Sequence, residues 1–374
     1  MPHRKQQREN AMRKVRKTNR QPKGEAFMAF DIGSTSIKLC IAQVHGRSIT
    51  IERLVETPLP PNAVREGTLL EPDTVARALR ETLQQAGKHP KAAVLTIAGP
   101  HTTARPVRLP PMPVEVLEKS IQFEAGRYLP SAAEEHFIGF EVVEQGEEYL
   151  EILLVAAPRA STEAFIDLIE KHNIEVELVE LQPFAFWRAI QTAYRGHTPP
   201  AYAFVDIGGG HTQVSVVRGP LLALTRHIPI AGETFSAALK GYFHYSDEEA
   251  EQIKRGLNLA DLIEHIPQEN PPLRLVQPIL DELIREIRRS LNYYQSQQTE
   301  QGQPKPVTTV ILSGGAARMP GLDEYMAKKL NLEVRTLGIL DNPRFSYGGT
   351  DDPGTGMELS AASGLALRAY PKAA

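Results

Sequence analysis

Residues 27–44 read FMAFDIGSTSIKLCIAQV, and they determine the architecture that the sequence predicts. The apolar run 27–30 is typical of a buried strand, and it ends at Asp31-Ile32-Gly33. A polar turn follows, and from Ile37 onward apolar side chains alternate with others at the period of a strand. Strand, tight turn and returning strand together predict a β-hairpin, with Asp31 and Gly33 at its tip.

The same pattern recurs in residues 201–217, which read AYAFVDIGGGHTQVSVV. Asp206-Ile207-Gly208 again ends an apolar strand, a polar turn and a returning strand follow, and a third strand is expected over Leu221–Ile228. Asp31 and Asp206 are 175 residues apart, which is far longer than the period of a solenoid repeat. The sequence therefore predicts two similar lobes, each presenting one hairpin tip to a shared cleft.

Both tips have the chemistry of a phosphate site. Glycines let a backbone approach a ligand closely, and successive N–H groups in a turn form an anion-binding nest. Lys38 can add a cation, and carboxylates such as Asp31 and Asp206 are ligands that suit Mg²⁺. Asp31 and Asp206 are the predicted metal ligands. The predicted phosphate ligands are Gly33, Ser34, Thr35, Ser36, Lys38, Gly208, Gly209, Gly210, Thr212 and Gln213.

A third glycine motif, Ser313-Gly314-Gly315, follows a predicted buried strand at Val307–Leu312. Small residues at this point would let a flat base lie against the backbone, although an ordinary strand-to-helix turn has the same composition. The chain contains no GxxxxGK[ST] motif, which excludes a Walker-type NTPase. No G-x-G-x-x-G follows a strand either, so a Rossmann dinucleotide site is unsupported.

Composition sets further limits on the class of protein. The chain has 374 residues, and its single Cys40 excludes a disulfide framework and any multi-thiol metal site. Residues 1–25 hold nine Lys/Arg and two acids, a net charge of +7, which leaves −10 for the rest of a chain whose total is −3. We expect this tail to be disordered. It is a solubilising leader, the result of a wrongly chosen start codon, or a contact for anionic lipid or nucleic acid, and the acidic body argues against nucleic-acid binding by the folded part.

Between the two lobes, residues 107–180 have the pattern of a separate α+β unit. After prolines at 110, 111 and 113, a helix is expected over 114–129, strands over 139–144 and 149–156, a helix over 161–172 capped by Ser161, and a closing strand over 174–181. Elsewhere we expect helices over 74–86, 183–194, 246–255 (capped by Ser246), 278–297 and 360–369, and a loop over 340–356. The predicted domains are a tail 1–25, a first lobe 26–106 with 181–200, the inserted unit 107–180, and a second lobe 201–374 with a helical subdomain at about 232–303.

These motifs, taken in order, resemble those of the actin-like ATPase superfamily, which includes actin, sugar kinases, chaperone ATPases and the division protein FtsA. Residues 30–38 and 205–212 are similar to its two phosphate motifs, 312–321 to its adenosine motif, and 181–185 and 361–366 to its connecting helices. The resemblance implies a two-lobed actin-like (ribonuclease H-like) α/β fold with an FtsA-type inserted subdomain. It also implies an ATP site with Mg²⁺, to which Gly314, Gly315 and Arg318 would contribute.

Within that superfamily the chain resembles the PilM family of type IV pilus assembly proteins, through IQFEAGRYLP at 121–130 and AEQIK at 250–254. The resemblance implies a cytoplasmic ATP-binding protein at the inner face of the membrane, which binds the cytoplasmic N-terminal segment of a PilN-like membrane protein. Self-association is left open. Glu251 and Lys254 would then contact the ribose or adenine, although an exposed i,i+3 ion pair has the same spacing. The partner segment would dock near the helix that bears Glu124, Arg127 and Tyr128, although a helix that only packs on its own sheet would have the same sequence.

The position before Pro183 bears on hydrolysis, because sugar kinases and chaperones of the superfamily often carry a carboxylate there. This chain has Gln182, which can orient a water molecule but cannot act as a base. We therefore predict tight ATP binding with weak hydrolysis. A small-molecule kinase of the same fold, an FtsA-like filament-forming adaptor and a secretion-system adaptor remain alternatives, and Gln182 and the small inserted unit argue against the kinase.

Overall fold

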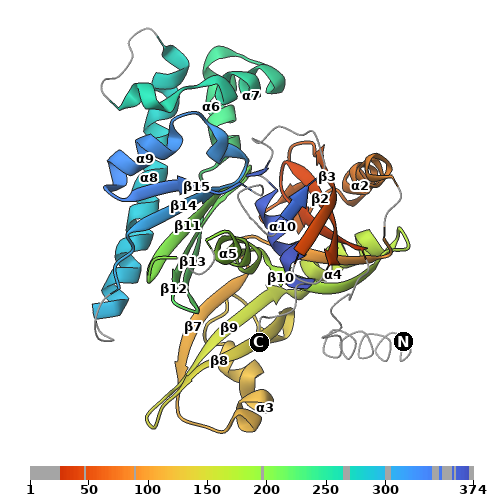
Figure 1. Ribbon diagram of the computed structural model, residues 1–374, viewed down its shortest axis with the longest axis vertical. Helices are drawn as coiled ribbons and strands as arrows, with labels where there is room; N and C mark the ends of the chain where they lie inside the picture. Colours follow the sequence, from red (N-terminus) through yellow and green to blue (C-terminus); the bar gives the residue numbers. More distant parts are fainter. Residues whose placement is uncertain are drawn as a thin grey trace.

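The computed structural model describes residues 26–45, 48–87, 90–194, 198–263, 270–299, 305–338, 345–347, 356–357 and 359–369. They form two α/β lobes, each built on its own sheet, and a smaller three-stranded sheet lies at one end of the molecule (Figure 1). The basic tail 1–25 and most of the predicted loop 340–356 lie outside the described residues.

The sheet of the first lobe has the strand order β10-β6-β1-β2-β3-β16. Strands β1, β2 and β3 form an antiparallel meander, as the sequence predicts, and Asp31 of β1 pairs with Lys38 of β2. Strands β6 and β10 continue the sheet in parallel on the other side of β1. The bounds are β1 (Ala26–Ile32), β2 (Ser36–His45), β3 (Ser48–Pro58), β6 (Ala92–Ile97), β10 (Glu175–Leu181) and β16 (Phe345–Tyr347).

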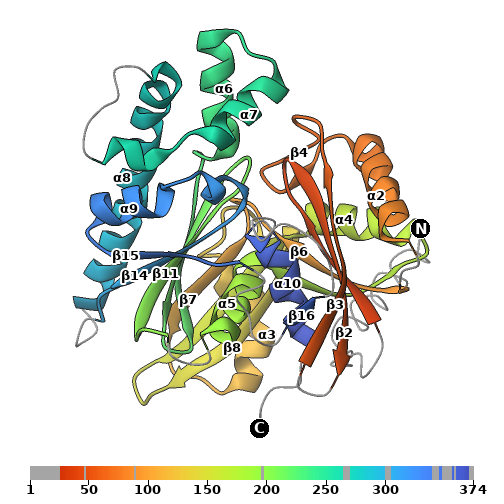
Figure 2. The same ribbon diagram turned by 45° about the horizontal axis from the view of Figure 1, so that its top comes forward.

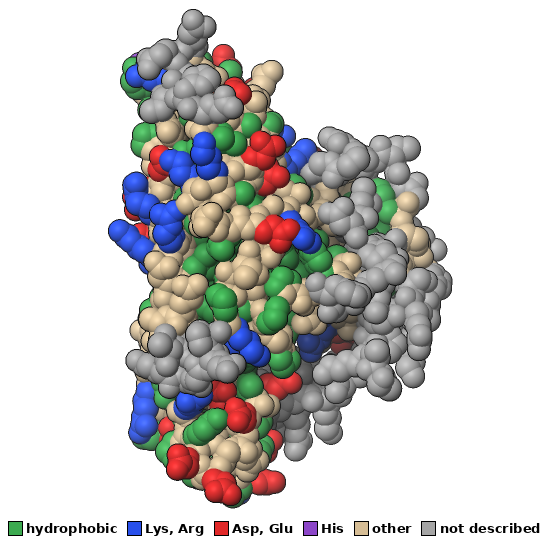
Figure 3. Space-filling view, turned by 60° about the vertical axis from the view of Figure 1, so that its left-hand side comes forward, with side chains coloured by type: hydrophobic (Ala, Val, Ile, Leu, Met, Phe, Trp, Pro, Cys, Tyr) green, Lys and Arg blue, Asp and Glu red, His purple; other side chains and the backbone are tan. Residues whose placement is uncertain are grey.

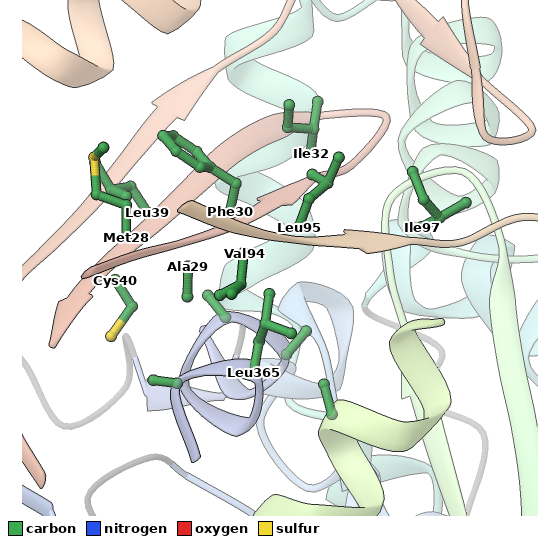
Figure 4. Close-up of a cluster of buried hydrophobic side chains, with 14 of the residues drawn as sticks. Met28, Ala29, Phe30, Ile32, Leu39, Cys40, Val94, Leu95, Ile97 and Leu365 are labelled. Carbon is green, nitrogen blue, oxygen red and sulfur yellow. The ribbon is translucent and has the colours of Figure 1, made fainter. Parts of the chain in front are cut away.

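Alternating side chains bury both faces of this sheet. Phe30 and Leu95 point to one face, whereas Ala29 and Val94 point to the other, toward Leu365 of the last helix (Figure 4). All but Val94 are fully buried, which is why apolar residues run without interruption through these strands. Around the sheet lie α2 (Pro72–Ala86), α4 (Arg159–Glu170), α5 (Gln182–Ala193), α10 (Ser360–Ala366) with its 3₁₀ extension η6 (Leu367–Ala369), and the small hairpin β4 (Val64–Arg65) and β5 (Thr68–Leu69) (Figure 2).

The second lobe repeats this arrangement. Its sheet has the order β13-β12-β11-β14-β15, and β11 pairs antiparallel with β12 and parallel with β14, as β1 pairs with β2 and β6. The two aspartates therefore end equivalent strands, and the prediction of two similar lobes is confirmed. The bounds are β11 (Ala201–Ile207), β12 (Thr212–Arg218), β13 (Leu221–Ile228), β14 (Thr309–Ser313) and β15 (Glu333–Thr336).

The inserted unit is smaller than the sequence predicts. Its sheet has the order β7-β9-β8, and α3 packs on one face through Leu117 and Ile121. The strand expected to close this unit, β10, instead pairs with β6 of the first lobe, and α4 buries Phe165 and Leu168 in the first lobe's core. We infer from these pairings that the inserted unit spans about 103–158. Its elements are β7 (Thr103–Leu109), α3 (Val114–Ala125), η1 (Ala133–Glu135), β8 (His136–Gln145) and β9 (Leu150–Pro158).

Helices cover the second sheet and form a subdomain above it (Figure 1). Ser246 begins α7 with a capping box, because its hydroxyl accepts from the Glu249 amide while the Glu249 carboxylate accepts from the Ser246 amide. This cap confirms the sequence prediction. The remaining elements are α6 (Gly232–Phe243), α7 (Asp247–Gly256), η2 (Leu259–Leu262), α8 (Pro271–Thr299), η3 (Gly315–Arg318) and α9 (Leu322–Leu330).

Several predicted boundaries are wrong. Helix α3 ends at Ala125 rather than at 129, and α8 begins at Pro271, so Pro278 lies inside a helix that it was expected to start. Ser161 does not cap α4, which begins at Arg159 after Pro158, and residues 345–347 form a strand beside β3 within the predicted loop. No helix in the described part of the chain is long and apolar enough to cross a membrane.

Candidate functional site

The two hairpin tips come into direct contact. A Cβ atom built on Gly209 of the second tip would lie 2.3 Å from Cγ2 of Thr35 and 3.0 Å from Oγ of Ser34. The same Ser34 oxygen would lie 3.0 Å from a Cβ built on Gly210. Side chains larger than hydrogen cannot stand at 209 without moving the first tip. Residues 175 positions apart in the chain therefore form one site.

Asp31 is held in place by side chains of the first lobe. Its Oδ1 accepts a hydrogen bond from Oγ1 of Thr96 at 2.9 Å and from Nε2 of Gln182 at 3.2 Å, and all three residues are buried. Thr96 lies on β6, beside Asp31 in the parallel pairing, and Gln182 opens α5. Two neutral donors stabilise the carboxylate without an adjacent cation being needed.

Asp206 lies in a different environment. Burial and, to a lesser extent, the neighbouring Asp31 carboxylate raise the pKa of Asp206, Lys38 opposes both, and together they bring it to about 7. Its Oδ1 lies so close to Gly314 that a Cβ there would come within 2.5 Å. No described side chain donates a hydrogen bond to Asp206. The two carboxylates and Lys38 therefore interact across the lobe boundary, as the sequence predicts.

The second tip rests on the N-terminus of α6. The amide of Gly232 donates to the carbonyl of Gly208 at 3.0 Å, and the amide of Glu233 donates to the carbonyl of Gly209 at 2.9 Å. These bonds fix the carbonyl side of the tip. The three glycines at 208–210 are thus held by the helical subdomain behind them and by Ser34 and Thr35 in front.

Lys254 joins α7 to this cluster. Its ammonium donates to the carbonyl of Gly232 at 3.3 Å and to Oγ of Ser236 at 3.0 Å, and it also pairs with Glu251. The Lys254 side chain is 8% exposed and that of Glu251 is 39% exposed. The alternative of an exposed i,i+3 ion pair is therefore wrong for Lys254, which is a buried cation behind the second tip.

The third glycine motif lies on the other side of Asp206. Gly314 has φ +94°, a backbone conformation that favours glycine, and its amide donates to the carbonyl of Met357. Oγ of Ser313 donates to the same carbonyl at 3.0 Å, which ties the motif to the segment before α10. Gly315 begins η3, which ends at Arg318, and a Cβ on Gly315 would meet nothing within 4 Å. The open space beside Gly315 suits a planar group.

Several buried polar groups here lack protein partners. The amide of Gln213 is fully buried, and neither its nitrogen nor its oxygen has a hydrogen-bond partner among the described residues. The same holds for Oε1 of Gln182, and no described carboxylate forms an ion pair with Lys38. Buried polar groups are normally paired, so these atoms point to a polar ligand or ordered water. Their donors and the two carboxylates fit a phosphate chain and a divalent cation.

The predicted partner residues lie elsewhere, in the inserted unit. Arg127 and Tyr128 follow the C-terminus of α3 rather than lying on the helix, and Arg127 pairs with Glu124 at 3.6 Å. The guanidinium of Arg105 lies 5.5 Å from the centre of the Tyr128 ring. Beside them, Phe123 is 71% exposed. Phe123, Glu124, Arg127 and Tyr128 therefore lie at the C-terminal end of α3, where Phe123 and Arg127 are exposed and Tyr128 is half-buried, apart from the hairpin tips.

Sequence reasoning missed three contributors to the site. Thr96 bonds Asp31, and Gly232 and Ser236 hold Lys254. Thr96 could have been found, since a hydroxyl near the end of an otherwise apolar strand is unusual. Gly232 and Ser236 carry no such signal, because their role depends on where α6 packs.

The duplicated β-hairpin lobes, joined at their tips with two aspartates between them, define an actin-like ATPase fold. Solved structures share it: MreB5 of Spiroplasma citri bound to AMPPNP matches with TM-score 0.53 and 11% identity, covering 92% of this chain and 96% of that one. The chain matches the family model described as type IV pilus assembly protein PilM over residues 29–370, and it belongs to that family.

Two further likenesses agree with this assignment. A structure described as a PilM-PilN type IV pilus biogenesis complex matches with TM-score 0.79 and 23% identity, covering 93% of this chain and 99% of that one. The cell division protein FtsA of Bacillus subtilis is 22% identical over 366 residues, which is 87% of this chain and 82% of FtsA. The predicted family and the predicted fold are both confirmed.

Proposed function

We propose that this chain is the ATP-binding component of a type IV pilus assembly complex, located on the cytoplasmic side of the inner membrane through a PilN-like partner. Membership of the PilM family supports the pilus role. The observation that carries ATP binding is the contact of the two hairpin tips, Ser34 and Thr35 against Gly209 and Gly210, with Asp31 and Asp206 between the lobes. A relative of the same fold was solved with AMPPNP.

Different residues would bind the phosphates, the cation and the adenosine. The backbone amides of both tips and the ammonium of Lys38 would hold the phosphates, and Asp206 with Asp31 would hold Mg²⁺, directly or through water. Gly314 and Gly315 would accept the adenosine, with Lys254 and Glu251 behind the second tip. The bound cation would supply charge neutralisation at the phosphates, and it would relieve the repulsion between Asp206 and Asp31.

Hydrolysis should be slow. One N–H of the Gln182 amide already donates to Asp31, so the second N–H and Oε1 remain for orienting a water molecule. Gln182 cannot act as a general base, because an amide does not accept a proton at neutral pH. We expect a turnover below about 1 s⁻¹, the lower end of ordinary enzymes. A purified protein that hydrolyses ATP faster than this would contradict the proposal.

Thermal unfolding with and without MgATP tests nucleotide binding. Ligand at 100 times its Kd should stabilise the unmodified protein by about 2.7 kcal/mol. Asp206→Ala should lose this stabilisation, whereas Asp73→Ala, an exposed aspartate in the first turn of α2, should keep it. If Asp206→Ala retained the full stabilisation, the assignment of the site would be wrong.

A peptide of the cytoplasmic N-terminal segment of the PilN from the same genome tests the partner. The neighbour described as a PilM-PilN complex motivates this choice, and the C-terminal end of α3, with exposed Phe123 and half-buried Tyr128, is the proposed contact. Tyr128→Ala should weaken binding at least tenfold, by about 1.4 kcal/mol. Tyr149→Ala is the matched control. Both tyrosines belong to the inserted unit, and each lies under an arginine, Tyr128 under Arg105 and Tyr149 under Arg108. If the two variants bound the peptide with equal affinity, Tyr128 would not be part of the contact.

A further inference from the structure

The inserted sheet has an open edge. In the order β7-β9-β8, the ten-residue strand β8 pairs with β9 on one side, and no other described strand pairs with its outer side. A long strand with unpaired backbone groups is a template for an added strand, and proteins usually shorten, cover or charge such an edge. Here Val143 and Glu144 are exposed along it, and so is Glu141.

The charge of this unit is strongly negative. Residues 103–158 contain ten acids and four bases, a net charge of −6. Acidic side chains gather at this end of the molecule (Figure 3). Two of the acids pair with arginines, Glu124 with Arg127 and Glu151 with Arg108. The others are exposed and form no ion pair with any described residue: Glu115, Glu118, Glu134, Glu135, Glu141, Glu144, Glu147 and Glu148.

The chain itself contains a segment of opposite charge. Residues 1–25 carry a net charge of +7, and their centre reads MRKVRK at 12–17, where two apolar side chains stand among four cations. We propose that this basic N-terminal segment docks along the outer edge of β8 in the same molecule. Its backbone would pair with the free groups of β8, as an added strand does, and its cations would face the unpaired glutamates.

Length and local concentration favour docking within one molecule. The 25 residues that precede β1 can reach roughly 80 Å when extended, against a radius of gyration of about 21 Å expected for a compact chain of this length. A tethered segment meets its site at an effective concentration in the millimolar range. Exposed ion pairs are individually weak, so tethering and the number of pairs make the contact stable.

Amide hydrogen exchange of β8 in the full chain tests the proposal. Reversing four tail charges, with Arg13→Glu, Lys14→Glu, Arg16→Glu and Lys17→Glu, should speed exchange of β8 peptides by about tenfold at low salt. High salt should have the same effect on the unmodified protein. The edge variant Glu141→Lys with Glu144→Lys should behave like the tail variant, and combining the two sets should restore slow exchange. Glu248→Lys with Glu324→Lys makes the same charge change on the second lobe and should leave β8 unaffected.

Three outcomes would overturn the proposal. Exchange of β8 could be the same in the tail variant and the unmodified protein. Protection of β8 could rise with protein concentration, which would assign the edge to the tail of a second copy. Finally, vesicles of phosphatidylcholine and phosphatidylglycerol could bind the tail while β8 exchange stays independent of the tail charges, which would make the tail a lipid-binding segment.

Discussion

The two hairpin tips carry the same Asp-Ile-Gly tripeptide, yet the protein surrounds their aspartates differently. Asp31 accepts hydrogen bonds from Thr96 and Gln182, whereas no described side chain donates to Asp206. Burial and the charge of Asp31 raise the pKa of Asp206 to about 7. One carboxylate is thus fixed by its own lobe, and burial makes the other costly to ionise. The comparison teaches that equal motifs can end in one positioned carboxylate and one whose charge is disfavoured.

The two tips also differ in residue type and in the space around their backbones. The first tip ends in hydroxyl side chains at 34–36, and the second ends in three glycines, of which Gly208 and Gly209 have their carbonyls held by the N-terminus of α6. A Cβ on Gly33 would meet nothing closer than 3.6 Å, whereas one on Gly209 would collide with Thr35. The second tip is therefore the one that depends on having no side chains.

The largest change in stability should come from removing the charge of Asp206, measured in buffer that contains no nucleotide and no divalent cation. The unfolded chain loses this proton near pH 4 and the folded protein near pH 7, so the folded protein loses stability as the pH rises between those values. Asp206→Asn does not ionise. Above pH 7 its free energy of unfolding should exceed that of the unmodified protein by up to ~4 kcal/mol, with little difference near pH 4. Urea unfolding at pH 4.5, 6 and 8 measures this.

The neighbouring aspartate provides the control. Asp31→Asn removes the nearby negative charge and should shift the pH-dependent loss of stability to lower pH, because the pKa of Asp206 falls. If unmodified protein and Asp206→Asn differ by the same amount at every pH, Asp206 does not titrate near neutrality, and the proposed division between the two carboxylates fails.

A smaller effect should separate two glycines beside the aspartates. Gly314→Ala places a methyl group at φ +94°, 2.5 Å from both Oδ1 of Asp206 and the carbonyl of Ile207, and should cost about 3 kcal/mol or more. Gly33→Ala meets no such contact and should change stability by less than about 1 kcal/mol. Thermal unfolding of both variants compares them. Equal losses would show that the crowding around Asp206 is not the cause.

The smallest effect concerns the positioned aspartate. Thr96→Val removes the hydroxyl that donates to Asp31 at 2.9 Å and should cost about 1–2 kcal/mol. In an Asp31→Asn background, where the acceptor is no longer charged, the cost should shrink. A double-mutant cycle by urea unfolding measures this coupling, and strict additivity would mean that Thr96 acts through packing alone.

Local pattern was enough to predict the elements around the site. Apolar runs ending in Asp-Ile-Gly gave both hairpins, and the charged first turn after Ser246 gave a capped helix. The prediction was wrong where an element's partner lies far away in the chain. Strand β10 joins the first sheet because β6 offers it a parallel edge, and nothing between residues 174 and 181 indicates which sheet it will join.

Site residues followed the same division. The sequence correctly placed both aspartates and their glycines at two strand ends, because an apolar run that stops at Asp-Ile-Gly marks such an end. Thr96 could have been noticed as a hydroxyl in an apolar strand, but its partner could not be predicted. Gly232 and Ser236 carry no signal at all, and all three act through a hydrogen bond to a residue at least 18 positions away. The burial of Lys254 could not be predicted either, because it depends on the packing of α7 against α6.

The amino-acid sequence alone determined the two hairpins, their glycine tips and the opposite charges of the tail and the body, because these depend on side-chain type and short-range periodicity. Only the tertiary structure decided that the tips touch and that, among the described residues, two side chains donate to Asp31 and none to buried Asp206, while no strand pairs with the outer edge of β8. Each of these depends on which surfaces pack together, and burial and the distance between charges set their energy after packing is complete.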